Sequence, residues 1–76
     1  MAIVQRDGFT LVNKKDGKPV EIDSLIESFR GETWYVQGGV PPHKPSSQGK
    51  IWASPFGETM MRELYPSVFD CKWIEA

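Results

Sequence analysis

Two short aromatic-rich segments flank a run of glycines and prolines, and this arrangement constrains the fold more than any other feature of the chain. The segments are residues 33–37 and 50–54, and the run between them is residues 38–49. Aromatic and β-branched residues favour strands, whereas glycine and proline mark turns and loops. We therefore expect two paired strands that carry a stiff loop.

Alternation within the two segments separates a core side from an outer side, because successive side chains of a strand point to opposite faces. The core side combines four apolar residues: Trp34, Val36, Ile51 and Ala53. The outer side carries Tyr35 and Trp52. Unless the sheet curls enough for the early hairpin or residues 25–29 to cover them, Tyr35, Trp52 and Trp73 remain on the outer side when Phe29 joins Trp34 on the inner face. More aromatic surface would then be exposed than on most monomers.

Length and charge limit the class of protein. A chain of 76 residues has room for one domain, residues 1–76, with a small core. Nine Lys plus Arg against ten Asp plus Glu give a net charge of −1, and neither sign forms a run. This balance argues against a general polyanion binder and against an acidic DNA mimic.

Cysteine usage and the first residues bear on location. Cys71 is the only cysteine, so no disulfide can form within the chain. Residues 1–7 lack the pattern of a signal peptide, no stretch approaches the length of a membrane span, and Ala2 stands where myristoylation needs glycine. We expect a cytoplasmic protein without a membrane partner.

The first third of the chain predicts a hairpin followed by an ambiguous segment. Residues 9–12 and 19–22 read as strands joined by a tight turn at Asp16 and Gly17. Residues 23–29 fit one or two helical turns, because Ser24 and Glu27 have capping-box spacing. An irregular third strand or a diverging loop fits equally well, because so short a helix is marginal without tertiary packing.

The last third predicts short strands. Residues 59–65 fit a strand after a turn of hairpin length, with a helix as the alternative because Met, Arg, Glu and Leu favour helices. Residues 65–69 fit a single 3₁₀ turn that places Val68 or Phe69 in the core. Residues 72–74 fit a closing strand.

This order of elements resembles the SH3-like small β-barrel family. The likeness is carried by residues 33–37, 50–54, 59–65, 65–69 and 72–74. It implies a mainly β fold: a single five-stranded SH3-like barrel with one short helical or 3₁₀ turn. The chain lacks the Ala-Leu-Tyr-Asp-Tyr run of signalling SH3 domains, so their polyproline groove does not carry over. Residues 30–32 and 65–69 are similar in style to small uncharacterised bacteriophage and prophage proteins.

The sequence favours no catalytic or metal centre. His43 is the only histidine and lies between a proline and a lysine in the loop. The chain has no Gly-x-Ser-x-Gly motif, which would supply a nucleophile for a histidine base. Cys71 alternates as a small apolar residue of the last strand. Two Cys and His residues in total are too few for a structural zinc site. Gly49 and Lys50 do not fit a phosphate-binding loop, because Ile51 follows them. We expect no enzyme activity, no cofactor and no metal.

The loop is the best candidate for binding. Pro41, Pro42 and Pro45 restrict its backbone, so it loses less entropy on binding than a flexible linker. The simpler interpretation is a rigid connector whose prolines prevent edge pairing. The candidate binding residues on the loop and around it are Arg30, Tyr35, His43, Lys44, Ser46, Ser47, Lys50 and Trp52.

These features predict a non-enzymatic binding module. The resemblance in style points to a phage or prophage accessory protein that contacts a host protein through residues 38–49 and the Tyr35/Trp52 face. The alternative is a nucleic-acid-binding small barrel in which Lys44, Lys50 and Arg30 flank a ligand stacked on the same aromatics. We expect a protein partner rather than nucleic acid, and the exposed aromatics also allow a homodimer.

Overall fold

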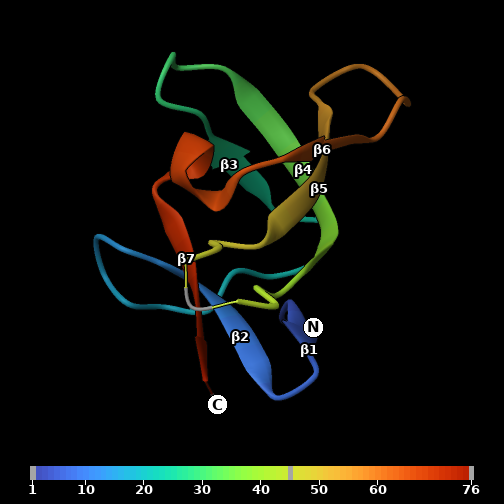
Figure 1. Ribbon diagram of the computed structural model, residues 1–76. Helices are drawn as coiled ribbons and strands as arrows, with labels where there is room; N and C mark the ends of the chain where they lie inside the picture. Colours follow the sequence, from blue (N-terminus) through green and yellow to red (C-terminus); the bar gives the residue numbers. More distant parts are fainter. Residues whose placement is uncertain (1, 45, 76) are drawn as a thin grey trace.

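The protein is a mainly β structure with one 3₁₀ turn. The computed structural model describes residues 2–44 and 46–75. Its elements in chain order are β1 (Gln5–Arg6), β2 (Phe9–Asn13), β3 (Leu25–Glu27), β4 (Thr33–Val40), β5 (Lys50–Pro55), β6 (Arg62–Leu64), η1 (Pro66–Phe69) and β7 (Cys71–Glu75) (Figure 1).

The strands form two antiparallel sheets. One has the order β1-β2-β7 and the other the order β3-β4-β5-β6. The expected closed five-stranded barrel is therefore wrong for the described residues, in which seven strands leave both sheets open. The edge strands β3 and β6 have only three residues each, so they end too early to pair with the other sheet. The mainly β prediction is confirmed.

The core lies between the two sheets. Trp34 and Val36 of β4, with the Ile51 and Ala53 of β5, are buried as predicted. Leu11 of β2 faces them from the other sheet, together with residues of β7 and η1. The Phe69 ring meets the Trp34 ring edge-on, with centroids 5.9 Å apart.

Two aromatic side chains have the opposite burial from the one expected: Phe29 is exposed and Trp73 is buried. Phe29 is 74% exposed, whereas Trp73 is only 8% exposed. Phe29 follows β3 at its end, where its backbone N–H donates to the Val68 carbonyl and its ring stays outside. Trp73 pairs with Leu11 on the inner face of its sheet and therefore points into the core.

The ambiguous segments are strands, but shorter ones than predicted. Residues 25–27 form β3 and pair with β4, so the helical alternative is wrong there. The Ser24 hydroxyl donates to the Glu21 carbonyl instead of capping a helix. Of residues 59–65, only Arg62–Leu64 form a strand. The 3₁₀ turn η1 and the closing strand β7 are confirmed.

The first hairpin is built differently from the prediction. The tight turn lies at Asp7 and Gly8, which both have positive φ, as a type I′ turn between β1 and β2 requires. The loop around Asp16 is longer, and the Asn13 N–H closes it by donating to the Lys18 carbonyl. Residues 19–22 contribute isolated bridges rather than a regular strand.

Strand β4 runs three residues further than predicted, into the part of the chain expected to be loop. A register shift between Val36 and Gly38 marks a β-bulge, after which Gly39 pairs with Ile51. A Cβ on Gly39 would lie 2.5 Å from the Lys50 carbonyl oxygen and 2.8 Å from the Trp73 ring. A Cβ on Gly49 would also lie 2.8 Å from that ring. The two glycines therefore make the space in which Trp73 packs.

Gly39→Ala should lower the free energy of unfolding by about 3 kcal/mol, because the added methyl group overpacks a site bounded by backbone and indole. Urea unfolding followed by tryptophan fluorescence measures the change. Gly57→Ala is the matched control: its Cβ meets nothing within 4 Å, so only the positive φ costs about 1 kcal/mol. Equal losses in the two variants would contradict the packing of Trp73 on Gly39.

Candidate functional site

The outer face of the four-stranded sheet carries an ordered row of aromatic side chains. Tyr35 pairs with Ser54, and Trp52 lies two residues before Ser54 on the same strand. Directly paired residues share a face, as do residues two apart, so Tyr35 and Trp52 lie on the same side. The prediction that they share the side opposite the core agrees with this register.

Two further rings extend the row. Phe56 stacks on Tyr35 with ring centroids 5.6 Å apart and planes 25° apart. Tyr65 follows β6, and the Lys50 Nζ lies 3.8 Å from its ring centroid. We call Tyr35, Trp52, Phe56 and Tyr65 the aromatic face. Phe56 and Tyr65 are more than half exposed, so the face is open to a partner.

Polar and charged groups hold the central ring of this face. The Trp52 Nε1–H donates to Glu63 Oε2 over 3.2 Å. The Arg6 guanidinium lies 5.6 Å from the Trp52 ring centroid, within the range of a cation–π contact. A Cβ on Gly38 would lie 3.4 Å from Trp52 Cε3, so the indole rests close to the backbone of β4. Trp52 is therefore supported from several directions.

The loop expected to bind starts at Pro41, because the first three of its predicted residues belong to β4. His43, Lys44, Ser46 and Ser47 are all exposed, as a presenting loop requires. The Ser47 N–H donates to the Lys44 carbonyl, which closes a turn at the tip. Pro41 is buried. The prediction for Pro45 falls on a residue outside those described.

The loop is also attached to the rest of the protein. Gln48 Oε1 accepts a hydrogen bond of 3.0 Å from the Ser67 N–H of η1. Gly49 donates its N–H to the Ser47 hydroxyl. Lys50 follows directly and reaches Tyr65. The loop and the aromatic face therefore meet at Lys50 and form one candidate surface.

Arg30 lies away from this surface. It sits in the turn before β4, whereas Lys50 pairs with Val40 at the far end of the same strand. The eight residues of β4 span about 23 Å at the usual rise of a strand. Figure 1 shows the two ends of β4 on opposite sides of the molecule. The Arg30 guanidinium instead lies 5.4 Å from the Phe29 ring centroid.

Sequence reasoning missed four members of this site: Arg6, Phe56, Glu63 and Tyr65. Two of them carried a usable signal. Glu63 and Tyr65 alternate along residues 59–65, so a strand there places both on one face. Phe56 gave no such signal, because it follows β5 in a turn and its ring folds back onto Tyr35. Arg6 reaches Trp52 from the other sheet.

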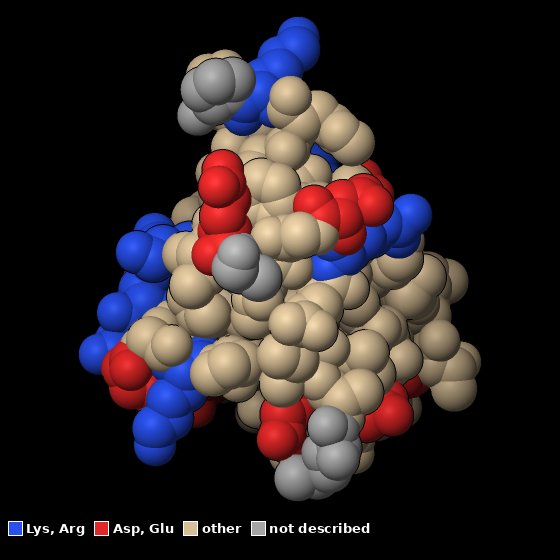
Figure 2. Space-filling model, turned by 90° about the horizontal axis from the view of Figure 1, so that it is seen from below, with Lys and Arg blue, Asp and Glu red and all other residues tan. Residues whose placement is uncertain are grey.

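The surface charge is mixed. Figure 2 views the molecule from the side of β1, β2 and β7 and shows basic side chains at the left, the top and the right of the view, with acidic ones between and beside them. Much of that view is uncharged. No single-sign field covers this side, in agreement with the net charge of −1.

The residue types that bind metal ions do not cluster in the described part of the chain. Residues 2–44 and 46–75 contain no group of three or more His, Cys, Asp and Glu placed to hold a metal ion. Among the same residues, no helix is long and apolar enough to cross a membrane. The Cys71 thiol is buried and donates to the Phe69 carbonyl over 3.4 Å. Burial, and secondarily the neighbouring Asp70 charge, raises the pKa of Cys71 to about 11.

Comparisons with known proteins found no match: no protein-family model fits the chain, and no curated protein or solved structure is significantly similar to it. The chain is thus defined by its residues and geometry as a small all-β protein of 76 residues.

The raised pKa of Cys71 predicts a loss of stability at alkaline pH. Its pKa is 9.0 without the shift and about 11 in the folded protein, so the unfolded chain loses the proton first. The folded state then binds more protons, and the free energy of unfolding falls from pH 9 to pH 11, by at most about 3 kcal/mol. Urea unfolding across this range measures it. Cys71→Ala is the control, and an equally steep fall in that variant would assign the effect to other groups.

Proposed function

We propose that the protein is a non-enzymatic binding module that contacts another protein through the aromatic face and the adjoining loop of residues 41–49. The observation that carries the proposal is the row of Phe56, Tyr35, Trp52 and Tyr65 on the outer face of one sheet. Aromatic side chains of this kind are the usual anchors of protein interfaces.

The order of the rings supports the same proposal. Tyr35 is held by Phe56, Trp52 by Glu63 and Arg6, and Tyr65 by Lys50. Side chains that are already ordered lose less conformational entropy on binding than free ones do. A rigid aromatic surface is therefore able to convert contact area into affinity.

The charges around the face favour a protein over a nucleic acid. Glu63 accepts the hydrogen bond of Trp52, which places a carboxylate beside the central ring of the face, and a carboxylate repels the phosphates of a nucleic acid. Arg30 lies at the other end of β4 from Lys50, so the three cations expected to flank a nucleic acid do not surround one site. Lys50 and Arg6 still offer stacked cations, which is the feature that keeps single-stranded nucleic acid as the second candidate.

Two further elements of the proposal rest on resemblance. The order of elements supports an opened variant of the SH3-like arrangement, in which the two sheets pack without closing. The similarity in style to small phage and prophage proteins supports an accessory role in the bacterial cytoplasm, with a host protein as the partner. A homodimer through the same face is a competing use of these aromatics.

Trp52→Ala should abolish most partner binding, because loss of a central aromatic anchor costs about 2 kcal/mol or more, roughly thirtyfold in affinity. Affinity capture from a bacterial lysate with the wild type identifies the partner, and calorimetry with the purified partner measures each variant. Ile74→Ala is the matched control: Ile74 is an exposed apolar residue on the other sheet and should bind as the wild type does.

Three outcomes would contradict the proposal. One is a partner bound equally well by Trp52→Ala. Another is a wild type that sediments as a dimer and becomes a monomer in Trp52→Ala. The third is saturable, salt-sensitive binding of single-stranded DNA, duplex DNA or RNA that is lost in Lys44→Ala and Lys50→Ala, because it would assign the face to nucleic acid.

A further inference from the structure

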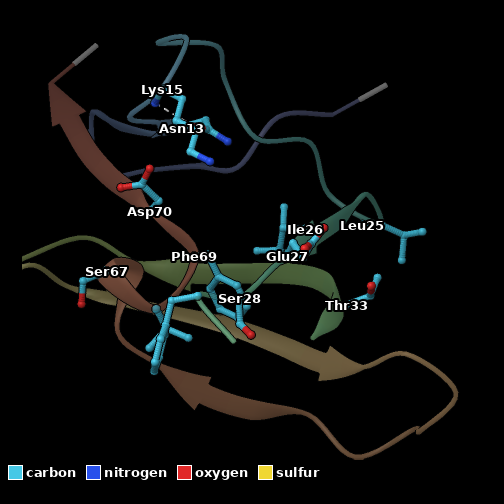
Figure 3. A pocket seen from close by; sticks show the side chains of 12 residues that line it. Asn13, Lys15, Leu25, Ile26, Glu27, Ser28, Thr33, Ser67, Phe69 and Asp70 are labelled. Carbon is cyan, nitrogen blue, oxygen red and sulfur yellow. Dashed lines mark hydrogen bonds between the residues drawn. The ribbon is translucent and has the colours of Figure 1, made fainter. Parts of the chain in front are cut away.

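A groove of about 650 Å³ runs along strand β3, and its lining includes none of the four residues of the aromatic face. The apolar part of its lining, which we call the floor, includes Ile26, Val68 and Phe69, and the rest of the lining is largely polar or charged. Figure 3 shows Asn13, Lys15 and Asp70 on one side of the groove, across from Ile26 and Phe69. The groove lies at the place where the edge of the four-stranded sheet faces the other sheet without pairing with it.

The edge of β3 beside this groove presents backbone groups without strand partners. The Val36 N–H donates to the Ser24 carbonyl, and the Ser28 N–H donates to the Glu32 carbonyl. Hydrogen-bonded pairs alternate in an antiparallel ladder, so Ile26 also bonds with β4, while the backbone groups of Leu25 and Glu27 point away from it. In the described part of the chain, β4 is the one strand that pairs with β3.

An added strand can form hydrogen bonds with all the outward-facing backbone groups of Leu25 and Glu27, whereas a single side chain can bond with only one or two of them. Their N–H and C=O groups have the spacing that an antiparallel strand satisfies with up to about four hydrogen bonds. The Phe29 N–H, which is next on this edge, already donates to the Val68 carbonyl and closes one end of the groove. The open edge is therefore short and bounded.

A narrow occupant fits this site better than a second copy of the protein does. Two copies paired through β3 would place groove against groove and leave both floors uncovered, which costs packing on both sides. A single extended segment is able to pair with β3 and also place a side chain on the floor. We propose that the β3 edge and its groove bind an extended peptide segment of a partner protein by strand addition.

The chemistry of the groove indicates the kind of peptide. Side chains of the added strand that lie on the same face as Ile26 would contact Val68 and Phe69, so an apolar residue is preferred there. The charged groups at the rim are Lys15, Glu27 and Asp70, which carry both signs. Binding by backbone hydrogen bonds and one apolar anchor should therefore depend weakly on salt.

Selection from a displayed library of random peptides of about nine residues, long enough to form a strand, tests the proposal. Selected peptides should carry an apolar residue at a common position and should slow amide hydrogen exchange at Leu25 and Glu27 of the wild-type protein. Leu25→Pro should weaken them by about tenfold, because it removes an outward-facing N–H without removing a bond to β4. Leu25→Ala keeps this N–H while also removing the side chain, so it should bind the peptides more tightly than Leu25→Pro does.

The exchange measurement on the wild type keeps the proposal testable if Leu25→Pro is unstable. Trp52→Ala should leave peptide binding unchanged, which separates this site from the aromatic face. The proposal is overturned if no peptide is enriched, if the selected peptides slow exchange elsewhere, or if Leu25→Pro binds them normally while folded. A wild-type dimer that Leu25→Pro dissociates would also overturn it, in favour of a second copy at the same edge.

Discussion

The contact of Trp73 with two glycines is the constraint on which the rest of the structure depends. Trp73 belongs to β7 of the three-stranded sheet, whereas Gly39 belongs to β4 and Gly49 directly precedes β5 in the other sheet. In so small a chain, one large aromatic side chain contributes much of the area that holds two open sheets together. Its Nε1–H is buried without an acceptor among the described residues, so the contact stabilises by shape rather than by hydrogen bonding.

This packing also places the functional surfaces. The bulge before Gly38 lets β4 continue beneath Trp73 and at the same time leaves Gly38 under the Trp52 ring on the outer face. Gly49 fixes the end of the loop, so that Lys50 enters β5 beside Tyr65. The packing of Trp73 and the aromatic face therefore lie on opposite sides of the same strands, β4 and β5. The groove along β3 lies at the other edge of this sheet, where the two sheets separate.

Local sequence patterns predict the central strands, but they do not predict which faces of the two sheets pack against each other. Alternation identified Trp34 and Val36 as core residues because a period of two is a property of one strand. Trp73 and Phe29 were assigned to the wrong sides, because their burial depends on which sheet covers them. Barrel closure was also predicted wrongly, since it depends on the lengths of edge strands. The Asp-Gly pair at residues 7–8 matches the hairpin-turn pattern as well as the pair at residues 16–17 does, so the dipeptide alone does not choose between them. In the candidate site, alternation predicts the positions of Tyr35 and Trp52. The stacking of Phe56 on Tyr35 is visible only in the three-dimensional structure.

Amide hydrogen exchange of a Trp73→Phe variant tests most directly whether this one side chain holds the two sheets together. The smaller ring leaves a cavity against Gly39 and Gly49, so the free energy of opening should fall. The account predicts that amides of β2 and β5, which belong to different sheets, lose the same amount of protection. A loss confined to β1, β2 and β7, with β4 and β5 protected as in the wild type, would contradict it.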